Sequence, residues 1–172
     1  MPSILVSPLS EIHATIARHK PSHLITLLSP EHMIETPDGV ESARHLKLGV
    51  NDIVDAAAGT DPPAKIHIDQ LLVFSRTWSA EAPLLVHCWA GVSRSMAAAY
   101  IILCDRLGPG KEVRIAQELR TRAYYAWPNA LMIRLADEAL KREGRMIEAV
   151  RAIGAGTPVE EGQCKEFTLA DL

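Results

Sequence analysis

Short hydrophobic runs separated by polar and turn-forming segments predict the strands of this chain. The runs cover residues 4–6, 23–28, 44–50 and 84–86. Runs of this length, bounded by proline, glycine or polar residues, are typical of strands buried in a sheet. Because segments with helical spacing lie between them, the order of elements predicts an α/β fold with a central, mostly parallel twisted sheet flanked by helices.

The helical segments follow from apolar spacing and from helix-start residues. The first is expected to use Ser7 as its N-cap and Pro8 in its first turn, and to run to about residue 18. In residues 62–79, helical spacing places Ile66, Leu71 or Gln70, Phe74 and Trp78 on the face expected to pack on the sheet. Residues 96–103 are apolar nearly all round, which is typical of a helix buried in the middle of a domain. Further helices are predicted over residues 111–122, 130–143 and 145–153, whereas residues 29–41 are expected to be loop with at most a short helix around 31–34.

Length and composition predict one domain with a tail. The chain has 172 residues, of which 48% are hydrophobic, enough to bury a sizeable core. We expect residues 1–156 to form this domain. After the small-residue segment 154–156, we expect residues 157–172, with Cys164, to be a poorly anchored C-terminal tail.

Charge and cysteine content argue against several kinds of partner. A net charge of −3 and a pI of about 6.2 give no basic face, so neither nucleic acid nor an acidic membrane is an expected partner. Three widely spaced cysteines make no disulfide framework, and Cys104 is expected to be a core residue. Cysteines without a disulfide framework fit a reducing compartment, so we expect a cytoplasmic protein. No secretory signal and no run long enough to span a bilayer are visible.

The candidate chemistry is concentrated in residues 83–95, PLLVHCWAGVSRS. Here a strand leads through a small-residue turn into a helix, whose first amides have no internal partner and whose dipole adds positive charge. This arrangement favours a bound anion, and it favours the thiolate form of Cys88. Arg94 closes the turn with a planar fork of donors that matches two phosphoryl oxygens. Gly91 is expected to permit a backbone torsion or a close approach that a side chain would forbid.

Residues 87–95 resemble the H-C-x5-R-[ST] signature of the cysteine-dependent protein tyrosine phosphatase superfamily, and most resemble its small dual-specificity-like branch. Cysteine, arginine, their spacing, the glycine, the preceding histidine and the hydroxyl match in one window. The resemblance extends over residues 43–142 and is dense only in this window. The alternative is a buried structural cysteine beside a helix that begins Ser-Arg-Ser.

The resemblance implies a phosphomonoester hydrolase that works through a phosphocysteine intermediate. Cys88 would attack phosphorus, Ser95 would ease departure of the thiolate, and His87 would orient the nucleophile from behind. Asn129 either hydrogen-bonds the loop or simply starts a helix. No metal or other cofactor is implied, and the sequence has no cluster with metal-ligand spacing. The residues implied to bind the phosphate are Trp89, Ala90, Gly91, Val92, Ser93 and Arg94.

The departing oxygen of a phosphate ester needs a proton, so a general acid is required. Asp52 directly follows the predicted strand 44–50, where the resemblance places the acid, and is our choice. Asp55 is a rival because small residues that can move follow it. Asp61 precedes two prolines and is better explained as the N-cap of the next helix.

The substrate is constrained mainly by the loop. It carries no lysine between Cys88 and Arg94, whereas lipid-phosphate members of the superfamily tend to have basic residues there. The expected substrate is therefore a phosphotyrosine-containing protein or a small aryl phosphate, with phosphoserine and phosphothreonine left open. Two other functions fit part of the pattern. A catalytically weak phosphoresidue-binding module would lack the acid, and a rhodanese-like sulfurtransferase would need neither Asp52 nor Ser95.

Overall fold

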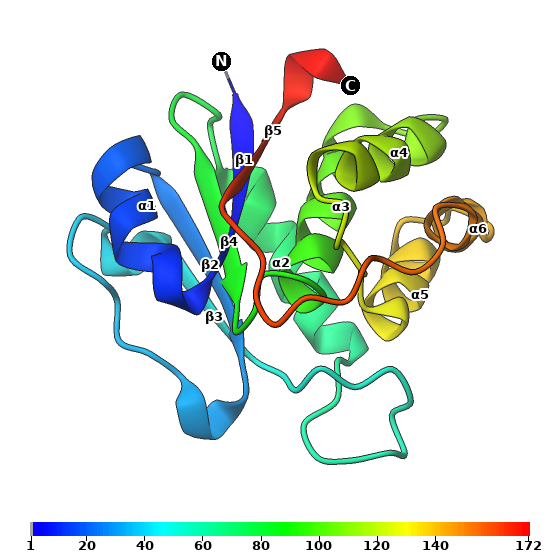
Figure 1. Cartoon of the computed structure of the whole chain (residues 1–172), viewed down its shortest axis with the longest axis horizontal. Helices are drawn as coiled ribbons and strands as arrows, with labels where there is room; N and C mark the ends of the chain where they lie inside the picture. The colour runs from blue at the N-terminus through cyan, green and yellow to red at the C-terminus, as the bar shows by residue number, and fades with distance from the viewer. Residues whose placement is uncertain (1) are drawn as a thin grey trace.

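A five-stranded sheet forms the centre of the computed structural model, which describes residues 2–172 (Figure 1). Its strand order is β3-β2-β4-β1-β5. Strands β1 to β4 pair in parallel, and β5 runs antiparallel to β1. The predicted mostly parallel α/β sheet is thus confirmed. The strands are β1 (Ser3–Pro8), β2 (His23–Leu28), β3 (His45–Gly49), β4 (Leu84–Cys88) and β5 (Lys165–Thr168).

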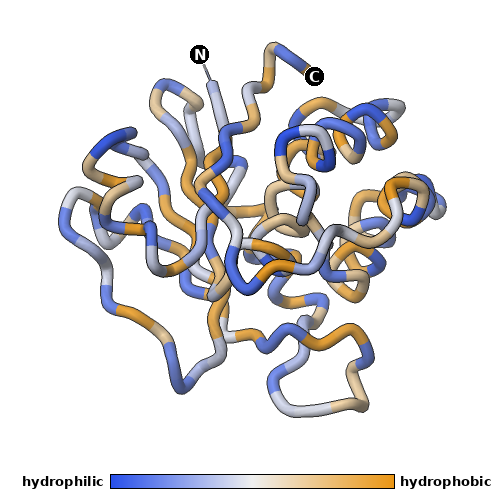
Figure 2. The backbone as a smooth tube through the Cα atoms, viewed as in Figure 1, coloured by the Kyte–Doolittle hydropathy of each residue, from blue (hydrophilic) through white to orange (hydrophobic). Residues whose placement is uncertain are grey.

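Helices cover the two faces of the sheet unequally (Figure 1). Helix α1 (Ile12–His19) packs on one face over a small core that includes Leu5 and Leu24. The opposite face carries the larger core, and α3 is completely buried from Met96 to Cys104, as predicted. Hydrophobic segments accordingly follow the strands and α3 in Figure 2. Among residues 2–172, no helix combines the length and apolar character that crossing a membrane requires. The other helices are α2 (Lys65–Thr77), α3 (Arg94–Leu107), α4 (Glu112–Arg122), α5 (Ala130–Ala139) and α6 (Arg145–Ala152).

The predicted start of the first helix is wrong. Ser7 and Pro8 belong to β1, where they pair with His87 and Cys88 of β4. Pro8 is tolerated there because β5 pairs only with residues 3–6 of β1, so the missing amide costs no ladder bond on that side. A single 3-10 turn at residues 9–11 then leads into α1.

The expectation of a poorly anchored C-terminal tail is also wrong. Residues 165–168 form β5, and Phe167 is fully buried against the large core. Cys164 donates its amide to Glu11 Oε2 at 2.7 Å. The small-residue segment 154–156 begins the connection that leads the chain from α6 back to β1, where β5 pairs with the strand edge not used by β4.

Helix α2 begins later than predicted, and its buried face is shifted. Its N-cap is Ala64, so Asp61 is no helix cap; Asp61 instead adopts a left-handed backbone with φ of 50°. Ile66 is 57% exposed, and Ile68 takes the buried position. Apolar residues two positions apart cannot both lie on one helical face, and the tertiary contacts select the second.

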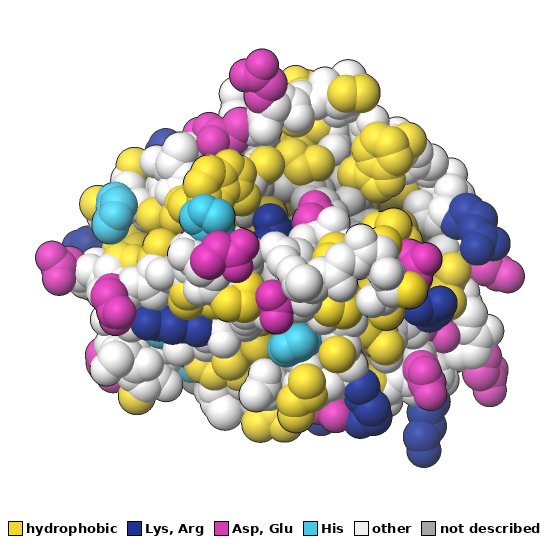
Figure 3. Space-filling view, turned by 90° about the horizontal axis from the view of Figure 1, so that it is seen from below, with side chains coloured by type: hydrophobic (Ala, Val, Ile, Leu, Met, Phe, Trp, Pro, Cys, Tyr) yellow, Lys and Arg dark blue, Asp and Glu magenta, His cyan; other side chains and the backbone are white. Residues whose placement is uncertain are grey.

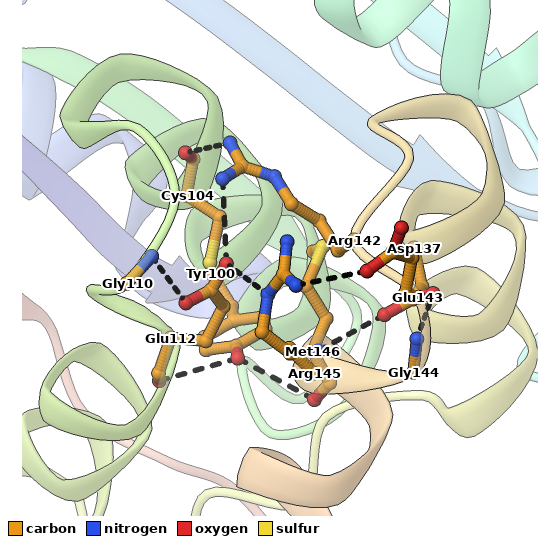
Figure 4. Close-up of polar contacts among 10 residues, drawn as sticks. All are labelled: Tyr100, Cys104, Gly110, Glu112, Asp137, Arg142, Glu143, Gly144, Arg145 and Met146. Carbon is orange, nitrogen blue, oxygen red and sulfur yellow. Dashed lines mark hydrogen bonds and ion pairs between the residues drawn. The ribbon is translucent and has the colours of Figure 1, made fainter.

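A buried polar cluster joins helices α3, α4, α5 and α6 (Figure 4). Glu112 of α4 pairs with Arg142 at 3.3 Å, and Arg142 also donates to the carbonyl of Cys104 at 2.8 Å. Asp137 of α5 accepts from the amides of Gly144 and Met146 at the start of α6. These bonds fix the position of α6 relative to the helix that follows the cysteine loop.

Candidate active site

Cys88 ends the central strand β4 at the carboxyl edge of the sheet, where open α/β sheets bind ligands. Figure 3 looks onto this edge, where the surface is hollowed and hydrophobic, histidine, basic and acidic side chains lie close together. The thiol is buried, with only 2% exposure. Its sulfur lies 3.1 Å from Ser95 Oγ and accepts from the amide of Gly91 at 3.3 Å. The expected contact between Ser95 and the sulfur is therefore present, and the amide of Gly91 adds a second one.

The loop between Cys88 and Arg94 has its carbonyl groups held on its outer side. Four of the five carbonyls, those of Trp89, Ala90, Val92 and Ser93, accept from backbone amides outside the loop, so the loop amides are left for its interior. Those of Ala90, Val92 and Ser93 donate to no acceptor within residues 2–172. Successive free amides of this kind form an anion-binding nest. In these outer hydrogen bonds a backbone amide donates to a loop carbonyl: Leu9 to Trp89 (3.0 Å), Gly162 to Ala90 (2.8 Å), Trp127 to Val92 (2.9 Å) and Asn129 to Ser93 (3.3 Å).

Gly91 is required by both torsion and space. Its φ is +71°, in the region that favours glycine. A Cβ at this position would lie 2.7 Å from the amide nitrogen of Pro8 and 2.9 Å from the carbonyl carbon of Ser7. The expectation for Gly91 is therefore confirmed, and the close approach is to strand β1.

Arg94 begins α3 and is buried, with 9% exposure. Its Nη1 donates to the carbonyl of Val50 at 2.8 Å, which orients the guanidinium. Its Nε has no hydrogen-bond partner among the described residues. A buried cationic donor without a partner is costly, and an oxyanion in the loop would supply one.

Asp52 lies beside the loop, in contact with two of the predicted site residues. Its Oδ1 accepts from Ser93 Oγ and from Asn129 Nδ2, both at 2.7 Å. No described residue donates to its Oδ2. The side chain of Asn129 caps α5, because its Oδ1 accepts from the backbone amide of Met132 at 3.0 Å. The backbone amide of Asn129 donates to the carbonyl of Ser93. Asn129 thus starts the helix through its side chain and bonds the loop through its backbone amide.

The rival acids lie in the same loop but outside these contacts. The Oδ1 of Asp55 accepts the amide of Ala57 at 3.0 Å in a local turn. The carbonyl of Asp61 accepts the amide of Asn51 at 2.8 Å and closes the loop at its base. Neither carboxylate contacts the cysteine loop, so the geometry favours Asp52.

His87 ends a buried hydrogen-bonded chain that crosses three strands. Nδ1 of His87 lies 3.3 Å from the carbonyl of Cys88, and a carbonyl only accepts, so Nδ1 carries the proton. Nε2 then accepts from Thr26 Oγ1 at 2.7 Å. That hydroxyl in turn accepts from Nε2 of His45, also at 2.7 Å, and Nδ1 of His45 accepts from Thr36 at 2.9 Å. Burial lowers the pKa of His87 and that of His45 to about 4, so both rings are neutral at pH 7.

Two aromatic rings stand at the mouth of the loop. Trp89, which is 54% exposed, meets His32 edge to face with ring centroids 5.5 Å apart. Ser29 fixes the imidazole through a contact of 2.8 Å with Nδ1. These residues and Arg94 line a pocket of about 240 Å³. The pocket is thus lined by an aromatic wall of Trp89 and His32 and by the side chain of Arg94.

Solved structures share this arrangement of sheet, loop and helices. DUSP15 superposes with a TM-score of 0.65 at 18% identity, over 89% of this chain and 91% of that chain. Human DUSP28 superposes with a TM-score of 0.63 at 19% identity, over 83% of this chain and 94% of that chain. The human tyrosine phosphatase-like serine/threonine/tyrosine-interacting protein gives 0.65 at 17% identity, over 83% and 94%. The chain has the fold of the dual-specificity phosphatases. No protein-family model matches the sequence, and no curated protein does.

Within this phosphatase fold, sequence reasoning missed residues that act through their neighbours. Thr26 and His45 lie inside predicted strands, and nothing local marks them as partners of His87. Gly162 lies in the presumed tail, although its amide holds the carbonyl of Ala90. The only available signal was polar residues inside otherwise apolar strands, because a buried polar side chain needs a partner.

Proposed function

We propose that the protein hydrolyses phosphomonoesters through a phosphocysteine intermediate, with phosphotyrosine in proteins as the preferred substrate. One observation carries the proposal. The loop that surrounds the sulfur of Cys88 has four of its five carbonyls held by outside amides and ends in Arg94. Within residues 2–172, three of its amides and the buried Nε of Arg94 have no hydrogen-bond partner. Such a cradle binds three phosphoryl oxygens in front of a nucleophilic sulfur.

In the first step, the thiolate of Cys88 attacks phosphorus, a sulfur–phosphorus bond forms, and the bond to the leaving oxygen breaks. The amides of the loop and the guanidinium of Arg94 hold the equatorial oxygens as charge develops on them. Asp52 transfers a proton from its free Oδ2 to the leaving oxygen. Its Oδ1 stays bound to Ser93 and Asn129, which keeps the carboxyl group beside the loop.

In the second step, water attacks phosphorus, and the carboxylate of Asp52 takes up its proton. The sulfur–phosphorus bond breaks, and inorganic phosphate leaves. Ser95, whose Oγ lies 3.1 Å from the sulfur, donates a hydrogen bond to the departing thiolate. The carbonyl of Cys88 is held by neutral His87, which supports the backbone that carries the nucleophile.

The aromatic wall supports a preference for aryl phosphates. A phosphotyrosine ring that enters the pocket has Trp89 and His32 beside it, and edge-to-face contacts between rings add about 0.5–1.5 kcal/mol beyond burial. A phosphothreonine side chain is shorter and offers no ring for this contact. The proposed preference for aryl phosphates therefore rests on Trp89 and His32, whereas the proposed hydrolysis rests on the loop from Cys88 to Arg94.

Turnover of p-nitrophenyl phosphate tests the proposal. We expect steady turnover that is lost in Cys88→Ser and reduced at least 10²-fold in Arg94→Lys, because a lysine cannot match two oxygens at once. Binding of phosphopeptides without turnover would indicate a binding module, and thiosulfate turnover without phosphatase activity would indicate a sulfurtransferase. Because one structural neighbour, PTPMT1, was crystallised in complex with PI(5)P, the substrate panel includes that lipid beside phosphotyrosine and phosphothreonine peptides.

A further inference from the structure

A second hollow lies beside the catalytic loop, on the helical side of the sheet. It has a volume of about 370 Å³ and lies between α5, α6 and the segment that precedes α5. Its walls are mainly apolar, with side chains contributed by Trp127, Pro128, Ile133, Ile147 and Val150. None of the residues assigned to the phosphate chemistry lines this groove.

The groove is continuous with the candidate active site. A neighbouring hollow of about 400 Å³ is lined by Asp52 and Ser93 and shares Trp127, Pro128 and Ala130 with the groove. Trp127 joins the two, since its amide holds the carbonyl of Val92 in the loop and its side chain is 52% exposed. A chain that leaves the phosphate cradle on the side of Asp52 therefore passes directly into the groove.

One guanidinium holds both walls of the groove in place. Arg120 of α4 donates to the carbonyl of Ala126, just before Trp127, at 2.8 Å. The same side chain donates to the carbonyls of Ile153, Gly154 and Ala155, which follow α6, at 3.0 Å each. Because both walls share this clamp, the groove is formed before any ligand binds, which lowers the ordering cost of binding.

The charge at the groove indicates what it accepts. Arg151 is the one charged residue of its lining, and its exposed guanidinium forms no ion pair with any residue in 2–172. A lipid acyl chain would fill the apolar walls but would offer nothing to this cation. A polypeptide can offer an apolar side chain and a carboxylate together, so the combination favours a peptide.

We propose that this groove binds the polypeptide of the phosphoprotein substrate next to the phosphorylated residue. An apolar side chain lies against Ile147 and Val150, and an acidic residue beyond it pairs with Arg151. The proposal rests on the proposed phosphatase function, because the cradle fixes where the substrate chain starts. It adds a sequence preference that the cradle and its aromatic wall do not supply.

Kinetics on a phosphotyrosine peptide library test the groove. Each peptide of the library has phosphotyrosine in an alanine background and one leucine at one of the four positions on either side of it. A glutamate or a lysine follows one or two positions beyond the leucine, away from phosphotyrosine. We expect one placement of leucine and glutamate to raise kcat/KM about 10-fold over that of the peptide with alanine at both positions. Val150→Asp should abolish this preference, and Arg151→Glu should reverse it from glutamate to lysine. Arg134→Glu makes the same charge change on α5 outside the groove lining and should leave the preference intact.

Turnover of p-nitrophenyl phosphate separates the two proposals. All three variants should match the wild type on this substrate, because it does not reach the groove. If the wild type turns it over but shows no register preference, or a preference that survives both groove variants, the groove proposal is wrong and the phosphatase proposal stands. A preference for long-chain over short-chain PI(5)P that Val150→Asp removes would assign the groove to lipid and overturn the peptide proposal. Absence of wild-type turnover would overturn both.

Discussion

Asn129 donates a hydrogen bond from Nδ2 to Oδ1 of Asp52 across 2.7 Å. The same side chain caps α5 through Oδ1, and its Nδ2 also reaches the carbonyl of Ile53 at 3.1 Å. Asn129 is 1% exposed, whereas its partner Asp52 lies at the surface. One buried amide thus joins the start of α5 to the loop that carries the candidate acid.

Substitutions of Asn129 should separate its two roles. Asn129→Asp keeps an oxygen for the amide of Met132 but loses the donor to Asp52 and adds a like charge beside it. We expect kcat with phosphotyrosine peptides to fall about 10-fold or more while α5 remains capped. Asn129→Ala loses both roles and should additionally cost about 0.5–2 kcal/mol of stability. Denaturant unfolding and steady-state kinetics on both variants provide the check. Equal kcat in Asn129→Asp and the wild type would show that the contact does not position the acid.

Removal of the acid itself should act selectively. Asp52→Asn should lower kcat by about 10² or more on substrates with poor leaving groups, because positioned acids contribute about 10²- to 10⁴-fold. Activated aryl phosphates leave without a proton and should be spared. The matched control is Asp55→Asn, whose carboxylate contacts only Ala57 of its own turn. The readout is a plot of log kcat against the pKa of the leaving group. A steeper slope in Asp55→Asn than in Asp52→Asn would identify Asp55, and not Asp52, as the general acid.

The sequence predicted what depends on neighbouring residues, and missed what depends on distant ones. The buried helix over Met96 to Cys104, the glycine at position 91 and the contact of Ser95 with Cys88 all lie within one strand-turn-helix unit. The edge strand at 165–168 has only one fully buried residue, Phe167, and its alternation is too short to distinguish it from a loop. Its partner lies at the other end of the chain, so no local pattern indicates the pairing.

The missed start of α1 has a similar cause. Serine followed by proline is a common helix beginning, and local chemistry alone favours it. In the structure, Ser7 and Pro8 extend β1 so that they lie beside His87 and Cys88, and the chain turns only afterwards. Pairing with β4 overrides the local preference. The same extension brings Pro8 against Gly91, which is why that position has no room for a side chain.

Neutral His87 and His45 should make stability depend on pH between about 4 and 6.5. Burial lowers the pKa of each to about 4, below the ordinary 6.5, so on acidification the unfolded chain binds protons that the folded chain does not. Stability is therefore lost as pH falls. For fully buried His87 the loss from pH 7 to pH 5 is about 2 kcal/mol. Urea unfolding at several pH values should show this slope.

The matched variants for this prediction are His87→Gln and His45→Gln. Each removes one titrating ring, so each should flatten the slope between pH 7 and 5 even if its stability at pH 7 is lower. A slope as steep in both buried variants as in the wild type would mean that other groups cause it.

The pair of Glu112 and Arg142 should be costly to break and cheaper to replace. Both residues are almost fully buried, with exposures of 3% and 5%, and their atoms lie 3.3 Å apart (Figure 4). Loss of one partner leaves a buried charge unpaired, which costs about 3–5 kcal/mol. We therefore expect Glu112→Leu to destabilise the protein by about that amount, measured by guanidinium unfolding. The exposed pair of Lys65 and Asp69 is the control, and Asp69→Asn should cost less than about 1 kcal/mol.

The double variant Glu112→Leu with Arg142→Met decides how the pair acts. If the cost of the single variant comes from the unpaired guanidinium, removal of that charge should recover part of the loss, because apolar pairs often replace buried ion pairs without penalty. Recovery will be incomplete, since Arg142 also donates to the carbonyl of Cys104 and Glu112 accepts the amide of Gly110. A double variant less stable than Glu112→Leu alone would show that the bond from Arg142 to the carbonyl of Cys104 contributes more to stability than relief of the unpaired charge.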